Sequence, residues 1–309
     1  MKLVCYFKRP KEYPHRNTRE SIENMCKSVG IEYEETSSIE RLRESNYSIL
    51  VSMAEFIDPE KENLPRHIKI VFGPHFWVFP RGEMVHEKKS ENYHCAFNCL
   101  STWVKDCYYE FSHSFYAPLV PFPFSIPVEK FRPRNEEKSK VILYIKRRNY
   151  NIVNKVRNLM KLLIRNDEMI EIEYGHYREE FFIESLHRSK FMVVLDAHES
   201  QGHALEEAMS MNVPLLVVDC KSMYDEFTDL HTCTYDYLKK DGKKLIATTV
   251  PYWSEKQCGL KLDEDEIDEK FVTCLFHMIE HYKEFEPRQF VLENLSDRVC
   301  MQRILDYFF

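Results

Sequence analysis

Short apolar runs alternate with stretches of helical periodicity along the first half of the chain. A helix is predicted from Asn17, where Asn17 and Glu20 form a capping-box pattern, to Gly30, which is a typical helix terminator. A second helix is predicted to begin after Ser101 and to end before Pro118. The strands predicted from the apolar runs of this half lie at residues 2–7, 49–51 and 68–72.

The alternation begins again after residues 132–140, a charged run without periodicity that is the best candidate for a linker. Strands are predicted there at residues 141–145, 169–172, 191–195 and 214–218. Helices are predicted at residues 153–163, 178–189 and 203–211. Strands that alternate with helices indicate parallel sheets, so the simplest fold class is α/β with two Rossmann-like, doubly wound domains.

Composition limits the classes of function. The 309 residues are 44% hydrophobic and 14% aromatic, which is typical of a folded globular protein. A net charge of −7 excludes a general attraction to nucleic acid. The ten cysteines form no C-x-x-C pair, and neither a signal peptide nor a membrane-spanning run is found. We therefore expect reduced cysteines and a cytoplasmic protein.

The richest stretch for chemistry follows the apolar run at 191–195. A glycine turn at Gly202 precedes a helix, with Glu199 before the turn and Glu207 after it. The free N–H groups of a helix start bind anions, so a ligand that carries phosphate is the first hypothesis. From the residues alone, Glu207 is either a ribose ligand or a solvated helix residue, and Gly202 is equally well a structural turn glycine.

This stretch resembles the E-x7-E signature of GT-B glycosyltransferases of the retaining branch, of the group 1 or family 4 kind. The segment E-S-Q-G-H-A-L-E-E-A-M-S-M-N-V-P-L-L-V is similar to that family's E-G-F-G turn, its L-E-A-M helix and its G-x-P-V-V strand. Residues 100–111, 125–133 and 258–267 also resemble family segments, in the family's order. The resemblance covers most of the chain from residue 100 onward.

The resemblance implies two Rossmann-like domains that face a cleft. The domains expected are an acceptor-binding domain at residues 1–131, a nucleotide-sugar-binding domain at 139–287, and a helical segment at 288–309 that packs back on the first domain. It also implies that Glu207 binds the ribose and that Glu199 contacts the transferred sugar as a catalytic residue. The residues expected around the diphosphate and the sugar are Gln201, Gly202 and His203.

Basic residues after the first strand of the second domain are candidates for the diphosphate. Arg147 fits the family's arginine best, although a K-R-R run is also compatible with an exposed strand end. The family's lysine position holds Ile152 here, so either Lys155 or Lys146 substitutes for it or the site differs from the family's. The residues expected near the base are Tyr174, Gly175 and Tyr177, although an aromatic rim without a ligand is the simple alternative.

The first domain offers fewer candidates. Lys8 and Arg9 follow the first strand and are expected to meet the acceptor or the diphosphate, but the family's glycines are missing from this loop. His75 occupies a position like that of the family's cleft histidine and is the second catalytic candidate. A histidine among aromatic residues is more often a packed core residue.

The implied activity is transfer of a sugar from a nucleotide-diphosphate sugar, with retention, to a glycan, a lipid-linked acceptor or a small molecule. No metal and no cofactor are expected, since the D-E-D-E run at 263–266 is better explained as an acidic helix start than as a metal motif. No nucleic acid partner is expected, and peripheral membrane contact stays open. The alternatives are a GT-B epimerase or phosphorylase and a non-catalytic module that binds nucleotide sugars or glycans.

Overall fold

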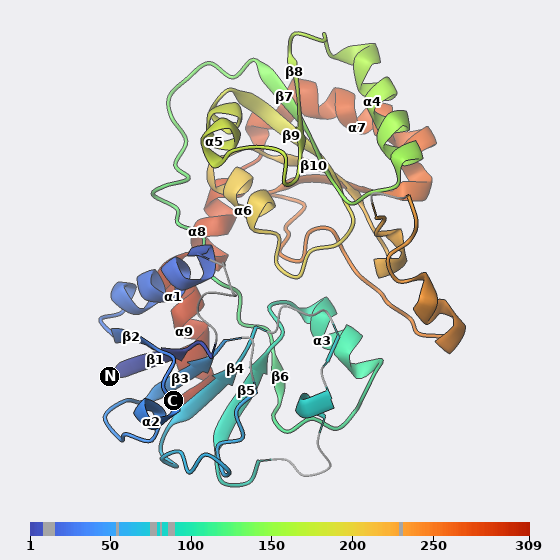
Figure 1. Ribbon diagram of the computed structural model, residues 1–309. Helices are drawn as coiled ribbons and strands as arrows, with labels where there is room; N and C mark the ends of the chain where they lie inside the picture. The colour runs from blue at the N-terminus through green and yellow to red at the C-terminus, as the bar shows by residue number, and fades with distance from the viewer. Residues whose placement is uncertain (9–15, 54–55, 75–78, 81, 86–89, 229–230) are drawn as a thin grey trace. The chain divides into compact units, whose positions relative to one another are not determined.

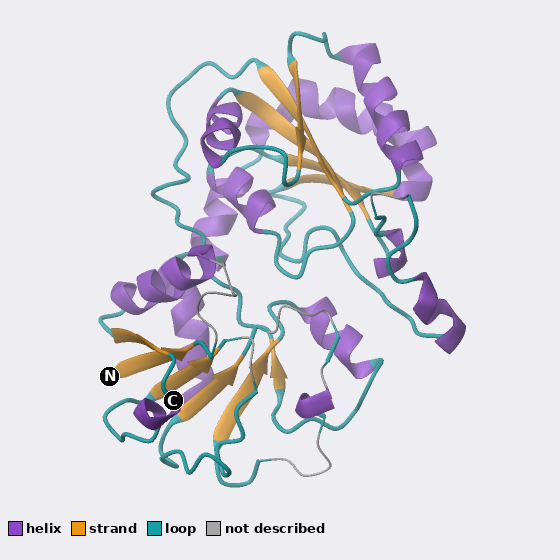
Figure 2. Ribbon diagram, in the orientation of Figure 1, coloured by secondary structure: helices purple, strands orange, loops and turns teal. Residues whose placement is uncertain are grey.

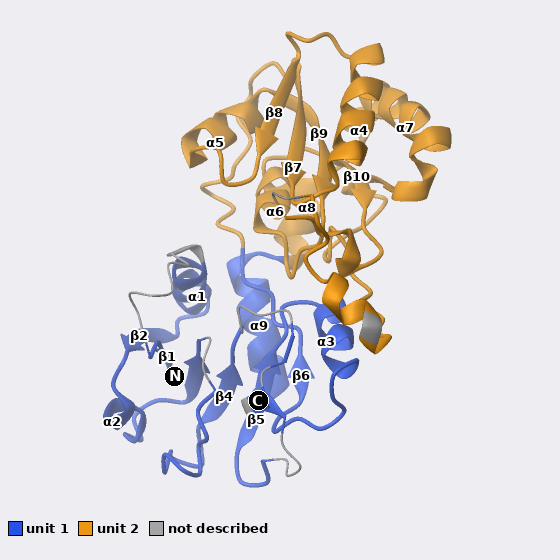
Figure 3. Ribbon diagram, turned by 45° about the vertical axis from the view of Figure 1, so that its right-hand side comes forward, with its two compact units in different colours: residues 1–125, 295–309 blue, residues 126–294 orange. Residues whose placement is uncertain are grey.

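The chain forms two compact units in the computed structural model, which describes residues 1–8, 16–53, 56–74, 79–80, 82–85, 90–228 and 231–309. Unit 1 contains residues 1–125 and 295–309, and unit 2 contains residues 126–294 (Figure 3). Each unit is built on its own parallel sheet (Figure 2). The predicted class, two parallel α/β domains, is confirmed.

Unit 1 contains a six-stranded sheet with the order β2-β1-β3-β4-β5-β6 (Figure 1). Its strands are β1 (Lys2–Tyr6), β2 (Glu32–Thr36), β3 (Ile49–Ser52), β4 (Lys69–Phe72), β5 (His94–Asn98) and β6 (Leu119–Val120). Its helices are α1 (Arg16–Ser28), α2 (Ile39–Leu42), α3 (Thr102–Tyr109), α9 (Asp297–Phe308) and the 3-10 turn η1 (Gly82–Met84).

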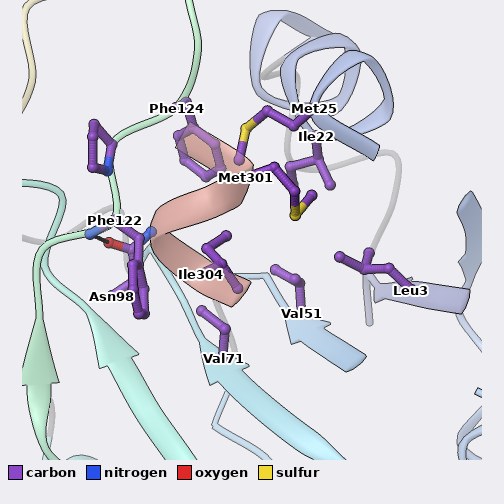
Figure 4. Close-up of a pocket in the computed structure, with 11 residues that line it drawn as sticks. Leu3, Ile22, Met25, Val51, Val71, Asn98, Phe122, Phe124, Met301 and Ile304 are labelled. Atoms are coloured by element: carbon purple, nitrogen blue, oxygen red, sulfur yellow. Dashed lines mark hydrogen bonds between the residues drawn. The ribbon is translucent and has the colours of Figure 1, made fainter. Parts of the chain in front are cut away.

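The core of unit 1 joins the two ends of the chain. Helix α9 packs beside α1. Ile22 and Met25 of α1 and Met301 and Ile304 of α9 surround a cavity of about 10 Å³ together with strand residues such as Leu3 (Figure 4). That volume is about what one water molecule needs, so this apolar space is a packing defect of the core rather than a ligand site.

One edge of this sheet is a polar strand. The sequence of β2 is E-Y-E-E-T, and the strand pairs only with β1 in the sheet order, with Lys2 opposite Glu32. The Lys2 ammonium lies 2.7 Å from Glu32 and 2.8 Å from Glu34, and Arg41 donates two hydrogen bonds to Glu34. The hydrophobic pattern did not predict β2 because charge pairing, not apolar burial, holds this strand.

Unit 2 contains a five-stranded sheet with the order β11-β10-β9-β7-β8. Its strands are β7 (Lys140–Lys146), β8 (Met169–Glu173), β9 (Ser189–Asp196), β10 (Leu215–Asp219) and β11 (Gly259–Asp263). Its α-helices are α4 (Tyr150–Leu163), α5 (Glu179–His187), α6 (His203–Ser210), α7 (Ile267–His281) and α8 (Pro287–Asn294). Its 3-10 turns are η2 (Met223–Asp225), η3 (Asp236–Asp241), η4 (Glu264–Glu266) and η5 (Tyr282–Glu284).

Helices cover both faces of the second sheet. Alternate residues of β7, such as Leu143, join the core formed with α4 and α7. Tyr144 points the other way, and its ring lies 6.2 Å from that of Phe182 on α5. Strands covered on both faces are apolar at nearly every position, which is why β7, β9 and β10 could be predicted as continuous apolar runs.

Several predicted boundaries differ from the structure. Helix α1 already includes Arg16, so Asn17 lies inside the helix and is not its N-cap. The helix predicted at 178–189 ends at His187, and Ser189 begins β9. Residues 126–139 belong to unit 2. The two C-terminal helices belong to different units, because α8 packs on α6 in unit 2 whereas α9 is part of unit 1. The roles assigned to the two domains stay predictions.

Among the described residues, no helix combines the length and the hydrophobicity that a bilayer span requires.

Candidate functional site

The strand order of unit 2 reverses between β7 and β9. Strand β8 follows β7 on one side, whereas β9, β10 and β11 follow on the other. At such a switch point the loops leave the sheet in opposite directions and open a crevice at the carboxyl ends of the strands. Lys146 and Asp196, the last residues of β7 and β9, are register partners at this point.

Lys146 is the cation at the centre of the switch point. Its ammonium donates a hydrogen bond to Glu199 and lies 3.9 Å from Asp196 and 4.4 Å from the centre of the Tyr174 ring. Burial alone would lower the pKa of Lys146, but the two carboxyl groups raise it above its ordinary value. Lys146 therefore keeps its charge, and the structure brings together Lys146, Glu199 and Tyr174, three of the predicted site residues.

The turn from Glu199 to α6 has the geometry that the sequence predicted. Gly202 is the N-cap of α6 and has a left-handed backbone with φ of +94°. A Cβ atom at this position would lie 3.4 Å from the Cβ of Glu199. That distance is an ordinary contact, so glycine is favoured here by the left-handed conformation rather than by lack of space. His203 begins the helix, and Gln201 is buried beneath the turn.

Gln201 contacts a carboxyl group that the sequence did not single out. Its side-chain amide donates to Glu206 at 2.9 Å, and Glu206 is 1% exposed. Burial raises the pKa of Glu206 well above its ordinary value, which favours the neutral form of this acid. Gln201 therefore supports the helix start, in addition to the ligand role predicted for it.

Glu207 is buried rather than solvated. It is 9% exposed, because α6 is covered along nearly its whole length, with α8 packed against it. Burial raises the pKa of Glu207 to about 8, the charge of Glu179 adds to the shift, and Lys130 opposes it. Burial raises the pKa of Tyr177, and the charge of Glu207 adds to this shift.

The two arginines after Lys146 have different environments. Arg147 has a left-handed backbone with φ of +46°, and its guanidinium is 62% exposed and lies 3.2 Å from Glu226. The same Glu226 carboxylate lies 3.3 Å from His198, a buried residue whose pKa is lowered by burial. The predicted phosphate ligand is thus exposed but already faces an acidic side chain.

Arg148 is a structural residue. Its side chain is fully buried and donates to the backbone oxygens of Asp196 at 2.7 Å and of Asp219 at 3.0 Å, and to the carboxylate of Glu264 at 2.8 Å. These contacts join the carboxyl ends of β7, β9 and β10 to η4. Arg148 therefore holds the strand ends on which the site is built.

The remaining predicted residues lie elsewhere or outside the description. Lys155 on α4 pairs with Asp268 at the start of α7, at 2.6 Å. Gly175 forms a turn after β8 with φ of +83°. Lys8 is exposed after β1, whereas Arg9 and His75 lie outside the residues that the structure describes. Of the two lysines, Lys146 lies at the switch point beside Glu199, whereas Lys155 pairs with Asp268.

No group of three or more metal-binding side chains was found within the described ranges. The acidic run predicted as a helix start forms η4 and leads into α7, and Asp263 and Asp265 both pair with Lys221.

Solved structures with the same arrangement are glycosyltransferases. The galactosyltransferase WaaB of the lipopolysaccharide outer core matches with a TM-score of 0.56 and 12% identity, over 100% of this chain and 99% of that one. A glycosyltransferase from Rickettsia africae matches with a TM-score of 0.58 and 10% identity, over 99% and 97% of the chains. The fold is GT-B.

Anabaena HepE, solved with UDP and glucose, has the same GT-B fold, with a TM-score of 0.54 and 8% identity over 99% of this chain and 98% of that one. No protein-family model matches the sequence, and no curated protein matches it either. At these identities the likeness is one of fold.

Three residues of the site were not predicted. Asp196, Glu206 and Glu226 all contact predicted ligands. Asp196 could have been found from the sequence, because it is a charged residue directly after the apolar run at 191–195. No sequence feature pointed to Glu226, because 79 residues separate it from Arg147.

Proposed function

We propose that this chain is a glycosyltransferase that moves a sugar from a nucleoside-diphosphate sugar to an acceptor, with retention and without a metal ion. The observation that carries the proposal is the group formed by Lys146, Glu199 and the Gly202 turn at the switch point of a GT-B fold. A cation and a helix start suit a diphosphate, and the carboxylate suits a sugar hydroxyl.

Each residue then has a role set by its position. Lys146 and the exposed Arg147 bind the diphosphate, together with backbone N–H groups at the start of α6. They stabilise the leaving diphosphate by fixed positive charge. Glu199 orients the transferred sugar, and Glu207 accepts hydrogen bonds from the ribose.

The base is proposed to lie near the β8–α5 turn. Tyr174 is 50% exposed and Tyr177 is partly buried at this turn. An exposed aromatic ring next to the site offers a stacking surface for a base. Lys146 contacts the ring of Tyr174, which links the base region to the diphosphate region.

The first test is a thermal-shift screen of nucleoside diphosphates and nucleotide sugars, since a ligand that binds the folded state raises the melting temperature. Binders are then tested by calorimetry and by release of nucleoside diphosphate with candidate acceptors. We expect Arg147→Ala and Glu199→Gln to weaken binding or turnover, whereas Glu280→Gln, at an exposed position on α7, serves as the matched control. Failure of every nucleotide sugar to bind would contradict the proposal, and binding without any transfer would support a binding module.

A further inference from the structure

Two histidines form a stacked pair on the exposed side of α7. His277 and His281 are four residues apart, which places them on neighbouring turns of the same helix face. Their ring centres lie 4.6 Å apart, with 29° between the ring planes, and both side chains are exposed. Two histidines of one helix bind zinc at this spacing in metalloproteases. The pair therefore has the separation that lets two imidazoles share one ion.

Neighbouring side chains position both rings. The Nδ1 atom of His281 lies 2.7 Å from Oε1 of Glu284, in the 3-10 turn that follows α7. A carboxylate accepts, so Nδ1 of the neutral ring donates and Nε2 keeps a lone pair for a ligand. The His277 ring lies 6.4 Å from the ring of Phe285, which packs against the core of unit 2. A carboxylate that orients the second nitrogen in this way is the usual outer partner of a metal-bound histidine.

We infer that His277 and His281 together bind one divalent transition-metal ion, such as Zn²⁺ or Ni²⁺, through their imidazole nitrogens. Imidazole suits Zn²⁺, Cu²⁺ and Ni²⁺, whereas Mg²⁺ and Mn²⁺ prefer oxygen ligands. Two nitrogens that each lie about 2.0–2.1 Å from one Zn²⁺ are roughly 3 Å apart, a distance that rotation of the two exposed rings allows. Water supplies the remaining ligands, since no third metal-binding side chain joins the pair in the part of the chain that the structure describes.

Cys274 is the alternative ligand on this face of α7, three residues before His277. Its side chain is partly buried and packs against the core of unit 2. Burial also raises the pKa of its thiol. Metal ions bind the thiolate rather than the thiol. Position and protonation therefore both favour the two histidines over Cys274.

The histidine pair belongs to a different part of unit 2 from the switch point. Arg148 holds Glu264 of η4 at the carboxyl ends of the strands, and α7 begins directly after η4 at Ile267. His277 is ten residues beyond Ile267, or about 15 Å along the helix axis. The inferred ion therefore has no part in the proposed transfer, and the inference does not rest on the proposed function.

The test is calorimetric titration of the full chain, without an affinity tag, with zinc, nickel and magnesium chloride. We expect Zn²⁺ and Ni²⁺ to bind, and the affinity for the tightest ion to fall more than about tenfold in His277→Ala and in His281→Ala. Glu284→Gln should weaken binding by about tenfold, the lower end of the range for an outer partner. Loss in only one histidine variant would overturn the inference, because a shared ion needs both rings.

Two further results would overturn it. A dissociation constant above about 1 mM for both Zn²⁺ and Ni²⁺ would mean that the pair does not form a site. Binding of Mg²⁺ as tight as that of Zn²⁺ would mean that carboxylates rather than imidazoles hold the ion.

His176 supplies the matched control. It is exposed, and its Nδ1 atom lies 3.3 Å from Glu173, much as His281 lies beside Glu284, but no second histidine occurs within four residues of it. His176→Ala and Cys274→Ser should both keep the affinity for Zn²⁺ within about threefold of wild type. A loss in His176→Ala equal to that in His281→Ala would overturn the inference, because removal of any exposed imidazole would then have the same effect. A similar loss in Cys274→Ser would overturn the assignment of the ligands to the two histidines.

Discussion

Replacement of Glu207 by glutamine tests two properties of this residue separately: its contribution to ligand affinity and its effect on the stability of the fold. Glu207 is 9% exposed, and burial raises its pKa from 4.5 to about 8. An acid with a raised pKa in the folded state binds a proton on folding. The wild-type protein therefore loses stability as the pH rises from about 4.5 to about 8, and the loss is complete above the folded pKa.

Glutamine has no charge to bury, so the variant escapes this loss. At about 1.36 kcal/mol for each pH unit, a pKa that moves from 4.5 to about 8 corresponds to at most about 5 kcal/mol of unfolding free energy. Glu207→Gln should therefore match the wild type near pH 4.5 and exceed it by a growing margin up to about pH 8. The same change should weaken nucleotide-sugar binding by about 0.5–1.5 kcal/mol at neutral pH, because one hydrogen bond to the ribose is lost.

The assay is denaturant unfolding of both proteins across this pH range, with Glu280→Gln as a control at an exposed position. A stability difference that does not change with pH would refute the burial argument. Unchanged affinity in calorimetry would refute the ribose role. Gain of stability with loss of binding is the expected combination, and it would mark Glu207 as a residue kept for function.

The remaining predictions concern neighbouring residues with different roles. Arg148→Met should lower the free energy of unfolding by about 3–5 kcal/mol in denaturant titrations, because Arg148 is buried. The exposed Arg147→Ala should change the free energy of unfolding by less than about 1 kcal/mol and should weaken donor binding instead. Equal stability of the two variants would contradict this prediction. Gly202→Ala should cost roughly 1–2 kcal/mol in thermal unfolding because of its left-handed backbone, so an unchanged melting curve would argue against strain there. Lys146→Ala should weaken donor binding in calorimetry by more than about tenfold, whereas Lys155→Ala should not; the reverse order would restore Lys155 as the phosphate ligand.

The sequence predicts the central strands well and the edges poorly. Residues 141–145 and 191–195 are apolar at every position because β7 and β9 are covered on both faces. Strand β2 shows no such pattern, since Lys2 and Arg41 hold it through charge pairs. A scan of hydrophobic periodicity detects burial, and it cannot detect a strand that is stabilised by its side-chain charges.

The candidate site divides in a similar way. Glu199, Gly202 and Glu207 lie within one turn and one helix, so their local spacing was enough to predict that they lie close together. The partners of Arg147 and Arg148 could not be predicted, because Glu226 and Glu264 come from loops that only the strand order brings near. The hydrophobic periodicity of a sequence shows which face of a helix or strand a residue lies on. It does not show which loops the fold brings together.

The polar edge strand has a consequence for how unit 1 meets other molecules. An open sheet edge is a template on which a strand from another molecule can add, and such addition leads to aggregation. Glu32, Glu34 and Glu35 place three acidic side chains along β2, where they pair with Lys2, Arg41 and Arg19 of the same unit. A second copy that offered its own β2 would bring like charges opposite each other. The sheet is thus protected against growth at this border, at the expense of a strand with little apolar burial.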